Sequence, residues 1–512
     1  MSETSQANNK RIAKNTVALY ARMLLSIVVS LYTSRVVLQT LGVEDYGIYG
    51  VVGGVVSILS FLNAAMSGAT SRFLTFEMGK GDFQRLCKTF SAAMVVHIVL
   101  ALIVLLLAET IGLWFLCNKM VIPENRMLAA HVVYQCSILG MIIGFTQVPY
   151  NAAIISHENM DVYAYVELLN TFLKLAIVYL LLIGNFDKLI LYAILMLIVS
   201  ISIAMVYRIY CVRYFPESRF NLSIDKEILQ PMLSFSSWNV LSECGYSFRV
   251  YGSNIVLNML FGPIVNAAGA LAATIQGILS SFVGNVVTAV RPQIIKSYGQ
   301  GNIIRTNRLI TSSVRLNLYL VSLSTIPIII DTNYIFSLWL GTVPDYAVEF
   351  CRLLLFTIYI SSVSQIITIG IHATGNLKLT SIVRNIIYIS TPIFIYYILR
   401  YFRLQPSFAY IAIVFSQMIT CISDLYILHR YLSQIECMRI FGDFIKSVAI
   451  LGMIITLFYY LFAGIEKTFL LVLLDIIIEF ALVSALFWFF MFKQDEKKMI
   501  IAAAEKIRDK LR

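Results

Sequence analysis

Seven basic residues lie inside apolar stretches of this sequence, where a positive charge is costly unless it meets a partner or a ligand. They are Arg22, Arg35, Lys174, Arg249, Arg315, Arg352 and Arg384. A guanidinium group binds phosphate oxygens through two parallel hydrogen bonds, and a low dielectric strengthens that attraction. The chemistry that these residues favour is therefore the binding of an anion.

The depth of each basic residue within its stretch indicates which of them would hold a ligand. Arg249 and Lys174 lie near the middle of their stretches, and Arg22 lies roughly 9 Å from one end at about 1.5 Å per residue. The other four lie nearer the ends, so we expect their long side chains to reach the interface. Glu243 does not face Arg249, because their separation turns the two side chains about 240° apart on a helix.

The elements that must position these residues are long apolar runs. Fourteen runs are each long enough to cross about 30 Å of hydrocarbon as a helix. They cover roughly 16–39, 49–71, 88–110, 127–149, 163–183, 189–210, 232–260, 266–290, 309–331, 347–371, 379–399, 407–428, 445–464 and 468–491. Barrel strands would alternate apolar and polar residues, whereas Leu100–Leu107 is solidly apolar. The sequence predicts an all-α polytopic membrane protein.

The composition agrees with that fold and excludes most soluble classes. Of the 512 residues 59% are apolar and 13% are charged, about half the charge that soluble proteins carry. There is no GxxxxGK[ST] phosphate loop, no HExxH and no GxSxG. The eight cysteines form no CxxC pair. We therefore expect no catalytic residues, no metal site and no nucleic-acid role, and the protein is not predicted to be an enzyme.

Basic residues set the expected orientation. With the N-terminus inside, most of the 39 lysines and arginines fall in the inside segments, which is the usual bias of membrane proteins. An even number of helices then places both termini in the cytoplasm. The run at 16–39 is too long for a signal peptide and has no obvious cleavage site, so we expect it to be retained. The soluble stretch Ile111–Arg126 separates the third and fourth runs.

Short matches recur at an offset of about 219 residues: Val37–Leu41 falls on Val256–Leu260, and, with one extra residue, Gly79–Asp82 falls on Gly299–Asn302. Such matches predict two parallel six-helix bundles, as in many secondary transporters. The expected organisation is a first bundle at 1–212, a cytoplasmic linker at 213–231, a second bundle at 232–430, helices 13 and 14 at 443–492, and an amphipathic cytoplasmic tail at 493–512.

Residues 35–50 resemble the first outer turn of Wzx-type bacterial polysaccharide flippases, which belong to the multidrug/oligosaccharidyl-lipid/polysaccharide (MOP) exporter superfamily. Ser71–Phe73 and Gly79–Asp82 resemble their first inner loop. Gly42 and Gly47 would allow tight backbone geometry at the outer turn. The resemblance implies a V-shaped pair of six-helix bundles around a central cavity. It also implies that undecaprenyl-pyrophosphate-linked oligosaccharide moves to the outer leaflet, as in O-antigen, lipopolysaccharide or capsule biosynthesis.

The resemblance gives the basic residues a ligand. Arg22, Arg249, Arg291 and Lys174 are the residues that we expect to bind the pyrophosphate. Arg22 and Arg249 occupy equivalent helices of the two halves, which line the cavity in the resembled family. Arg291 closes the eighth run at the inner mouth of that cavity.

Polar residues within the runs suggest two further roles. Trp238, Asn239, Tyr246 and Asn63 are candidates for sugar contact, with packing between helices as the alternative. Glu243, Asp475 and Glu479 are candidates for binding a coupling ion. A carboxyl with a raised pKa would carry a proton, whereas pairing with a basic residue is the alternative. The sequence does not choose between Na⁺ and H⁺, and it predicts no other cofactor.

Together these features predict a multi-pass transporter of the bacterial inner membrane. Its expected partners are the polyprenyl-linked oligosaccharide, membrane lipid and a polysaccharide polymerase or ligase. A drug/cation antiporter of the MATE type is the first alternative, although an arginine-rich cavity does not suit a cationic drug. A lipid II flippase is the second. A membrane glycosyltransferase or polymerase would need a large outer catalytic loop, which the sequence lacks.

Overall fold

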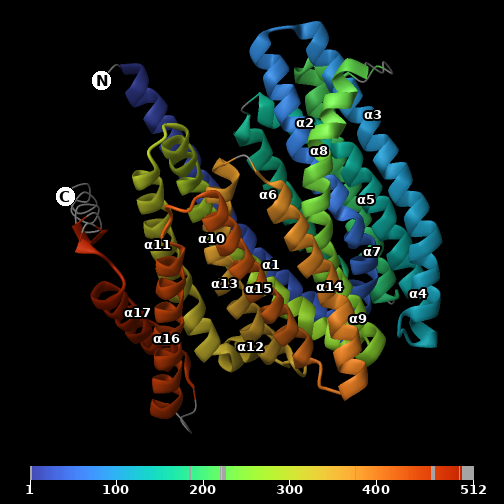
Figure 1. The fold of residues 1–512 in the computed structure, drawn as a ribbon. Helices are drawn as coiled ribbons and strands as arrows, with labels where there is room; N and C mark the ends of the chain where they lie inside the picture. The colour runs from blue at the N-terminus through green and yellow to red at the C-terminus, as the bar shows by residue number, and fades with distance from the viewer. Residues whose placement is uncertain are drawn as a thin grey trace. The chain divides into compact units, whose positions relative to one another are not determined.

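All regular elements that the computed structural model describes are helices (Figure 1). It describes residues 3–157, 159–183, 186–219, 221, 226–374, 376–462, 467–494 and 496–498, with only the backbone at some helical positions. Helices satisfy every backbone hydrogen bond within one segment, which the interior of a bilayer requires. The predicted all-α fold is confirmed.

The chain forms two compact units. The first comprises Met1–Ala270 and Tyr388–Pro406, and the second comprises Leu271–Ile387 and Ser407–Arg512. The first contains α1 (Glu3–Ser57), α2 (Phe61–Lys80), α3 (Phe83–Leu107), α4 (Leu113–Lys119), α5 (Met127–Ser156), α6 (Met160–Leu180), α7 (Lys188–Tyr214), α8 (Lys226–Ser247) and α9 (Ser253–Phe261). The second contains α11 (Ile303–Ile330), α12 (Thr332–Leu340), α13 (Ala347–Ala373), α15 (Ser407–Tyr431), α16 (Cys437–Leu461) and α17 (Phe469–Phe490). Residues of α10 (Pro263–Gly299) and α14 (Lys378–Phe402) belong to both.

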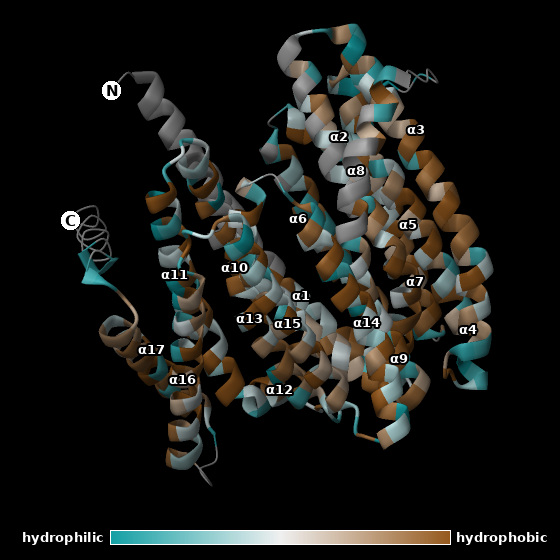
Figure 2. Cartoon of the chain, in the orientation of Figure 1, coloured by the Kyte–Doolittle hydropathy of each residue, from teal (hydrophilic) through white to brown (hydrophobic). Residues whose placement is uncertain are grey.

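Twelve helical stretches of the described chain are long and apolar enough to cross a membrane. Figure 2 shows the hydrophobic residues that run along α3 and α7 of the first unit. The predicted number of fourteen is therefore approximate. One difference is that the first stretch, Ile27–Asn63, contains residues 27–39 of the first predicted run and residues 49–63 of the second.

A glycine marks the turn within that first stretch. Gly42 has φ +82°, so α1 consists of two helices joined at a sharp bend. Gly262 has φ +81° and joins α9 to α10. Few residues other than glycine adopt this conformation without strain. Gly47 serves close packing instead, because a Cβ atom there would lie 1.9 Å from the carbonyl oxygen of Pro263.

The turn between α2 and α3 matches the turn between α10 and α11. Gly81 ends α2 with φ +74°, and Gly301 follows α10 with φ +71°. The Asp82 side chain accepts a hydrogen bond from the backbone N–H of Arg85, which caps α3. The Asn302 side chain accepts the same bond from the N–H of Arg305 at the start of α11. The predicted sequence repeat thus coincides with repeated backbone geometry.

One predicted boundary needs correction. The helix expected to end near residue 110 continues to Lys119, so most of the predicted soluble stretch Ile111–Arg126 is helical. Part of the predicted linker at 213–231 is folded onto the first unit, because the Phe215 ring stacks on His157 at 4.0 Å and Glu217 pairs with the same histidine. The two-bundle boundaries themselves stay a prediction.

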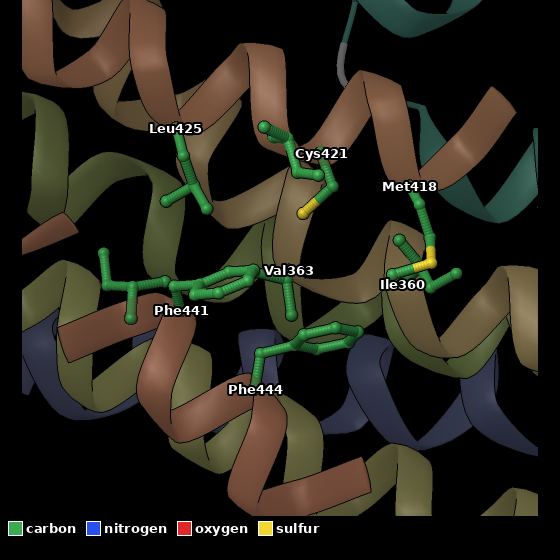
Figure 3. A pocket seen from close by; sticks show the side chains of 9 residues that line it. Ile360, Val363, Met418, Cys421, Leu425, Phe441 and Phe444 are labelled. Carbon is green, nitrogen blue, oxygen red and sulfur yellow. The ribbon is translucent and has the colours of Figure 1, made fainter. Parts of the chain in front are cut away.

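Dense apolar packing holds the second unit together. Figure 3 shows Ile360 and Val363 of α13, Met418 and Cys421 of α15, and Phe444 of α16 around one small gap. The gap has a volume of about 10 Å³, which is room for one water molecule at most. It is therefore a packing defect and not a ligand site.

Candidate functional site

Two π-helical segments interrupt the helices of the first unit. One covers Ala108–Gly112 between α3 and α4, and the other covers Phe248–Gly252 between α8 and α9. A π-helical turn holds one extra residue and is often found at functional sites. Each segment here ends on a glycine, and each borders the same cavity.

Close contacts hold both segments in place. The Tyr134 hydroxyl of α5 donates a 2.7 Å hydrogen bond to the Ala108 carbonyl oxygen. Gly112 makes room for that hydroxyl, since a Cβ atom there would lie 2.2 Å from it. In the second segment a Cβ atom on Gly252 would lie 3.2 Å from the Pro392 ring of α14. The glycines thus permit close approach rather than an unusual backbone conformation.

The cavity between the π-helical segments is apolar and has a volume of about 700 Å³. Most of its lining residues are aliphatic, among them residues of α1, α3, α9 and α14, and the aromatic residues in its wall include Phe115, Tyr134, Phe248 and Tyr396. Cavities of this size and character hold lipid-like or drug-sized molecules. All of its lining residues belong to the first unit.

Arg249 follows the cavity residue Phe248 directly, and only 8% of its surface is exposed. Its guanidinium carbon lies 4.2 Å from the centre of the Tyr388 ring and 5.5 Å from that of Tyr246. The faces of aromatic rings attract a cation, and more strongly where water is excluded. The sequence placed Arg249 deep in its helix, and the structure adds the two tyrosines, of which Tyr388 is distant in sequence and was not predicted.

The other predicted pyrophosphate ligands do not gather around Arg249 in the described residues. The Lys174 side chain is exposed on α6 of the first unit. The Arg291 side chain is exposed on α10 and belongs to the second unit. Arg22 lies in α1, but its side chain is outside the described residues. Their roles toward an anion stay predictions.

The sugar-contact candidates have different surroundings. Tyr246 is half exposed and contributes a ring to Arg249. Asn63 lies on α2, and its carbonyl oxygen is buried without a hydrogen-bond partner among the described residues. Trp238 and Asn239 belong to α8, but their side chains lie outside the described part of the chain.

The candidate coupling acids lie in different units and have different surroundings. Asp475 and Glu479 are fully buried on α17, and Asp475 accepts a hydrogen bond from Lys467. The sequence did not single out Lys467 or its second partner, Asp331, whose carboxylate lies 3.0 Å from the lysine nitrogen. Glu243 is half-buried on α8 of the first unit.

Three arginines that we expected to reach the interface have partners within the second unit. Arg315 forms ion pairs with Asp443, at 2.8 Å, and with Glu496. Arg384 pairs with Asp424 at 2.6 Å. Arg352 donates to the Ile329 carbonyl at the end of α11, at 3.1 Å. The sequence did not predict these partners, and the depth of the three arginines in a membrane stays a prediction.

Another ion-pair cluster lies in the connections at one end of the first unit. Arg126 bridges Asp45 and Asp187, with both N–O distances at 2.6 Å. Hydrogen bonding to Arg126 holds the pKa of Asp187 below its usual range. Asp187 also caps α7 by accepting bonds from the N–H groups of Leu189 and Ile190.

Within the described residues, no group of three or more histidine, cysteine, aspartate or glutamate side chains could hold a metal ion. All eight cysteines have free thiols. Among the described residues, two features are considered further: the apolar cavity beside Arg249 in the first unit and the buried acids of α17 in the second.

Comparison with known proteins shows which family this chain matches. Residues 10–298, more than half of the chain, match a family described as "Polysaccharide biosynthesis protein". A relative is the membrane protein EpsK of Bacillus subtilis (strain 168), which is 22% identical over 326 residues. That match covers 62% of this chain and 63% of EpsK, so it spans less than two thirds of the relative.

Solved structures show the same fold. The lipid II flippase MurJ, in an inward closed conformation, has a TM-score of 0.69 at 14% identity, over 93% of this chain and 99% of MurJ. An inward-facing multidrug resistance MATE family transporter of the MOP superfamily has a TM-score of 0.67 at 14% identity, over 82% of this chain and 99% of that transporter. At such identities the likeness establishes the fold and leaves the ligand to be argued from the residues.

Proposed function

The chain belongs to the polysaccharide biosynthesis protein family, and on that basis we propose that it is a flippase. Its substrate is an undecaprenyl-pyrophosphate-linked oligosaccharide, which it moves from the cytoplasmic to the outer leaflet of the bacterial inner membrane by alternating access. Both termini are cytoplasmic, and a polysaccharide polymerase or ligase uses the product. No covalent bond is made or broken.

One observation carries this proposal: a buried cation and an apolar cavity are neighbours within the first unit. A lipid-linked pyrophosphate has an anionic head and a long apolar chain. Arg249 supplies a charge of the right sign, and Phe248 and Gly252 of the same π-helical segment line the 700 Å³ cavity. The guanidinium would bind phosphate oxygens in pairs, while the cavity would take part of the apolar chain.

The tyrosines beside Arg249 suit this role. Their ring centres lie 4.2 Å and 5.5 Å from the guanidinium carbon, so they help to fix its position next to Phe248 of the cavity wall.

The test is complementation of a deletion strain with the wild type, Arg249→Ala and Arg249→Lys, scored by the accumulation of lipid-linked glycan. We expect wild type to clear the intermediate and Arg249→Ala to fail, at equal expression. A charge-assisted hydrogen bond contributes about 1.5–3 kcal/mol, so the loss should be roughly ten- to a hundredfold. Lysine keeps the charge but not the paired hydrogen bonds, so Arg249→Lys should be intermediate.

Arg400→Ala is the matched control. Arg400 also lies near a tyrosine ring of the first unit, at 5.8 Å from the centre of Tyr396, but its side chain is exposed. We expect this variant to complement fully. Normal glycan display together with greater drug sensitivity in the deletion strain would instead favour a drug antiporter. Accumulation of lipid II would favour a lipid II flippase.

A further inference from the structure

The contact between α11, α16 and α17 in the second unit contains more buried acid than base. Asp331 follows the last residue of α11, and Asp475 and Glu479 lie one turn apart on α17. The exposed fractions of these three residues are 2%, 0% and 0%. Lys467, just before α17, binds both aspartates, with its nitrogen 3.0 Å from Asp331. One lysine thus serves two of the three carboxyl groups.

Glu479 is the carboxyl group that this lysine does not bind. Both of its oxygens are buried and have no hydrogen-bond partner among the described residues. The four residues that precede Lys467, 463–466, include no lysine or arginine. An ionised carboxylate without a partner is very costly in an apolar interior. Glu479 therefore has to take up a cation, of which the smallest is a proton.

The charged groups around Glu479 come from the end of α11, from α17 and from the segment just before α17. Asp331 acts on it from the end of α11, Lys467 from the segment before α17, and Asp475 from α17 itself. In α16, Asp443 and Lys446 lie near the opposite end of the helix. The two tyrosines at the near end, Tyr459 and Tyr460, are largely exposed.

Polar groups continue from Glu479 along the contact between α11 and α17. Ser484 lies five residues further along α17 and shares a 3.0 Å hydrogen bond with the Tyr319 hydroxyl of α11. One turn before Tyr319, Arg315 pairs with Asp443 and Glu496. The contact therefore carries an ionisable cluster at each end, with Glu479 and two hydroxyl groups between them.

We propose that Glu479 is a proton-binding site, loaded through the Asp331–Lys467–Asp475 cluster, and that its protonation cycle drives transport. The proton site stands on the geometry of the second unit alone, whereas its coupling to transport rests on the proposed function. A hard metal cation takes several oxygen ligands at once, and the described residues offer no cluster of three metal-binding side chains. A proton needs one carboxyl group.

The first test is infrared spectroscopy of the full-length protein in lipid nanodiscs during a change of pH. We expect the wild type to show the carbonyl stretch of a protonated carboxyl group at neutral pH, and this band to disappear as the pH is raised. Glu479→Gln, which has the same shape without the proton, should lack the band. Glu436→Gln removes an exposed glutamate and should keep it. A band that is unchanged in Glu479→Gln would overturn the proposal.

The second test separates the proton site from the substrate. Proteoliposomes containing lipid-linked oligosaccharide are given either a pH gradient or a sodium gradient. The proposal predicts that the pH gradient accelerates wild-type transport and that Glu479→Gln loses this acceleration while still binding the lipid. Acceleration by the sodium gradient alone would overturn it. An infrared band that depends on Glu479, in a protein that moves no lipid-linked sugar, would uphold the proton site and refute the flippase.

A variant with a shorter acid covers the case in which Glu479→Gln does not fold. Glu479→Asp keeps an ionisable group on the same helix face, so we expect the band to remain but to titrate at a different pH. A titration identical to that of the wild type would place the proton on another residue and overturn the assignment.

Discussion

Arg384 and Asp424 show how this chain keeps charged residues inside apolar helices. Asp424 is fully buried on α15, and its carboxylate lies 2.6 Å from a nitrogen of Arg384 on α14. Removing one member of a buried pair leaves an uncompensated charge, whereas replacing both with apolar residues is often tolerated.

We expect Arg384→Met to destabilise the protein by about 3–5 kcal/mol, because it strands the buried Asp424 carboxylate. The double variant Arg384→Met/Asp424→Leu should recover most of that loss. The free energies come from unfolding of the purified protein by denaturant in detergent. A double variant that is as unstable as the single one would show that the pair is not a self-contained unit.

The Arg126 cluster gives a prediction on pH. Arg126 lowers the pKa of Asp187 in the folded protein, whereas an unfolded aspartate has a pKa of about 3.9. A carboxyl group whose pKa is lower in the folded protein stabilises the fold at pH values above its pKa in the unfolded chain. This stabilisation is lost as the pH falls through the pKa of the folded state. We therefore expect Asp187→Asn to lower Tm at pH 7, and the difference from wild type to shrink below about pH 4. A difference that does not vary with pH would contradict this.

At the scale of elements, close approach of backbones accounts for the glycines better than flexibility does. Gly47 and Gly50 are one turn apart in the second part of α1. A Cβ atom on Gly47 would lie 1.9 Å from the Pro263 carbonyl oxygen, whereas one on Gly50 would make an ordinary 3.8 Å contact with Ala270. The two positions therefore form a matched pair for substitution.

Gly47→Ala should destabilise the first unit strongly, because the contact is with backbone that has to move. An overpacked site typically costs about 1–3 kcal/mol. Gly50→Ala should be neutral or stabilising by roughly 0.5–1 kcal/mol, since alanine favours the helix. Thermal unfolding of both variants in detergent checks the pair, and similar Tm values would contradict the observed backbone contact.

Most helices could be predicted from apolar periodicity and length, whereas the π-helical segments and the ion pairs could not. The segment at Ala108–Gly112 depends on the Tyr134 hydroxyl, which reaches it from another helix. Arg315 meets partners 128 and 181 residues away in the sequence. Such contacts leave no local pattern, so the sequence did not predict which residues neutralise these charges.

At the scale of the whole molecule, the proposed orientation can be tested with native cysteines. Cys117 is exposed near the end of α4, on the side that we assign to the outside. Cys437 begins α16, in a segment that we assign to the inside. A membrane-impermeant maleimide added to intact spheroplasts should label the wild type but not Cys117→Ala. If Cys117→Ala is still labelled and Cys437→Ala is not, the chain has the orientation opposite to the one that we propose.

The two compact units carry different chemistry. The first contains the apolar cavity and Arg249, and the second contains the acid cluster around Glu479. The chain passes between the units within α10, within α14 and before α15. Any coupling between substrate and proton therefore has to pass from one unit to the other.

The matched turns also record the history of the chain. Gly42 and Gly262, Gly81 and Gly301, and Asp82 and Asn302 all recur at one offset of 220 residues with the same backbone geometry. Duplication of an ancestral gene segment leaves such a pattern. The two copies have thus kept the bends that shape the fold.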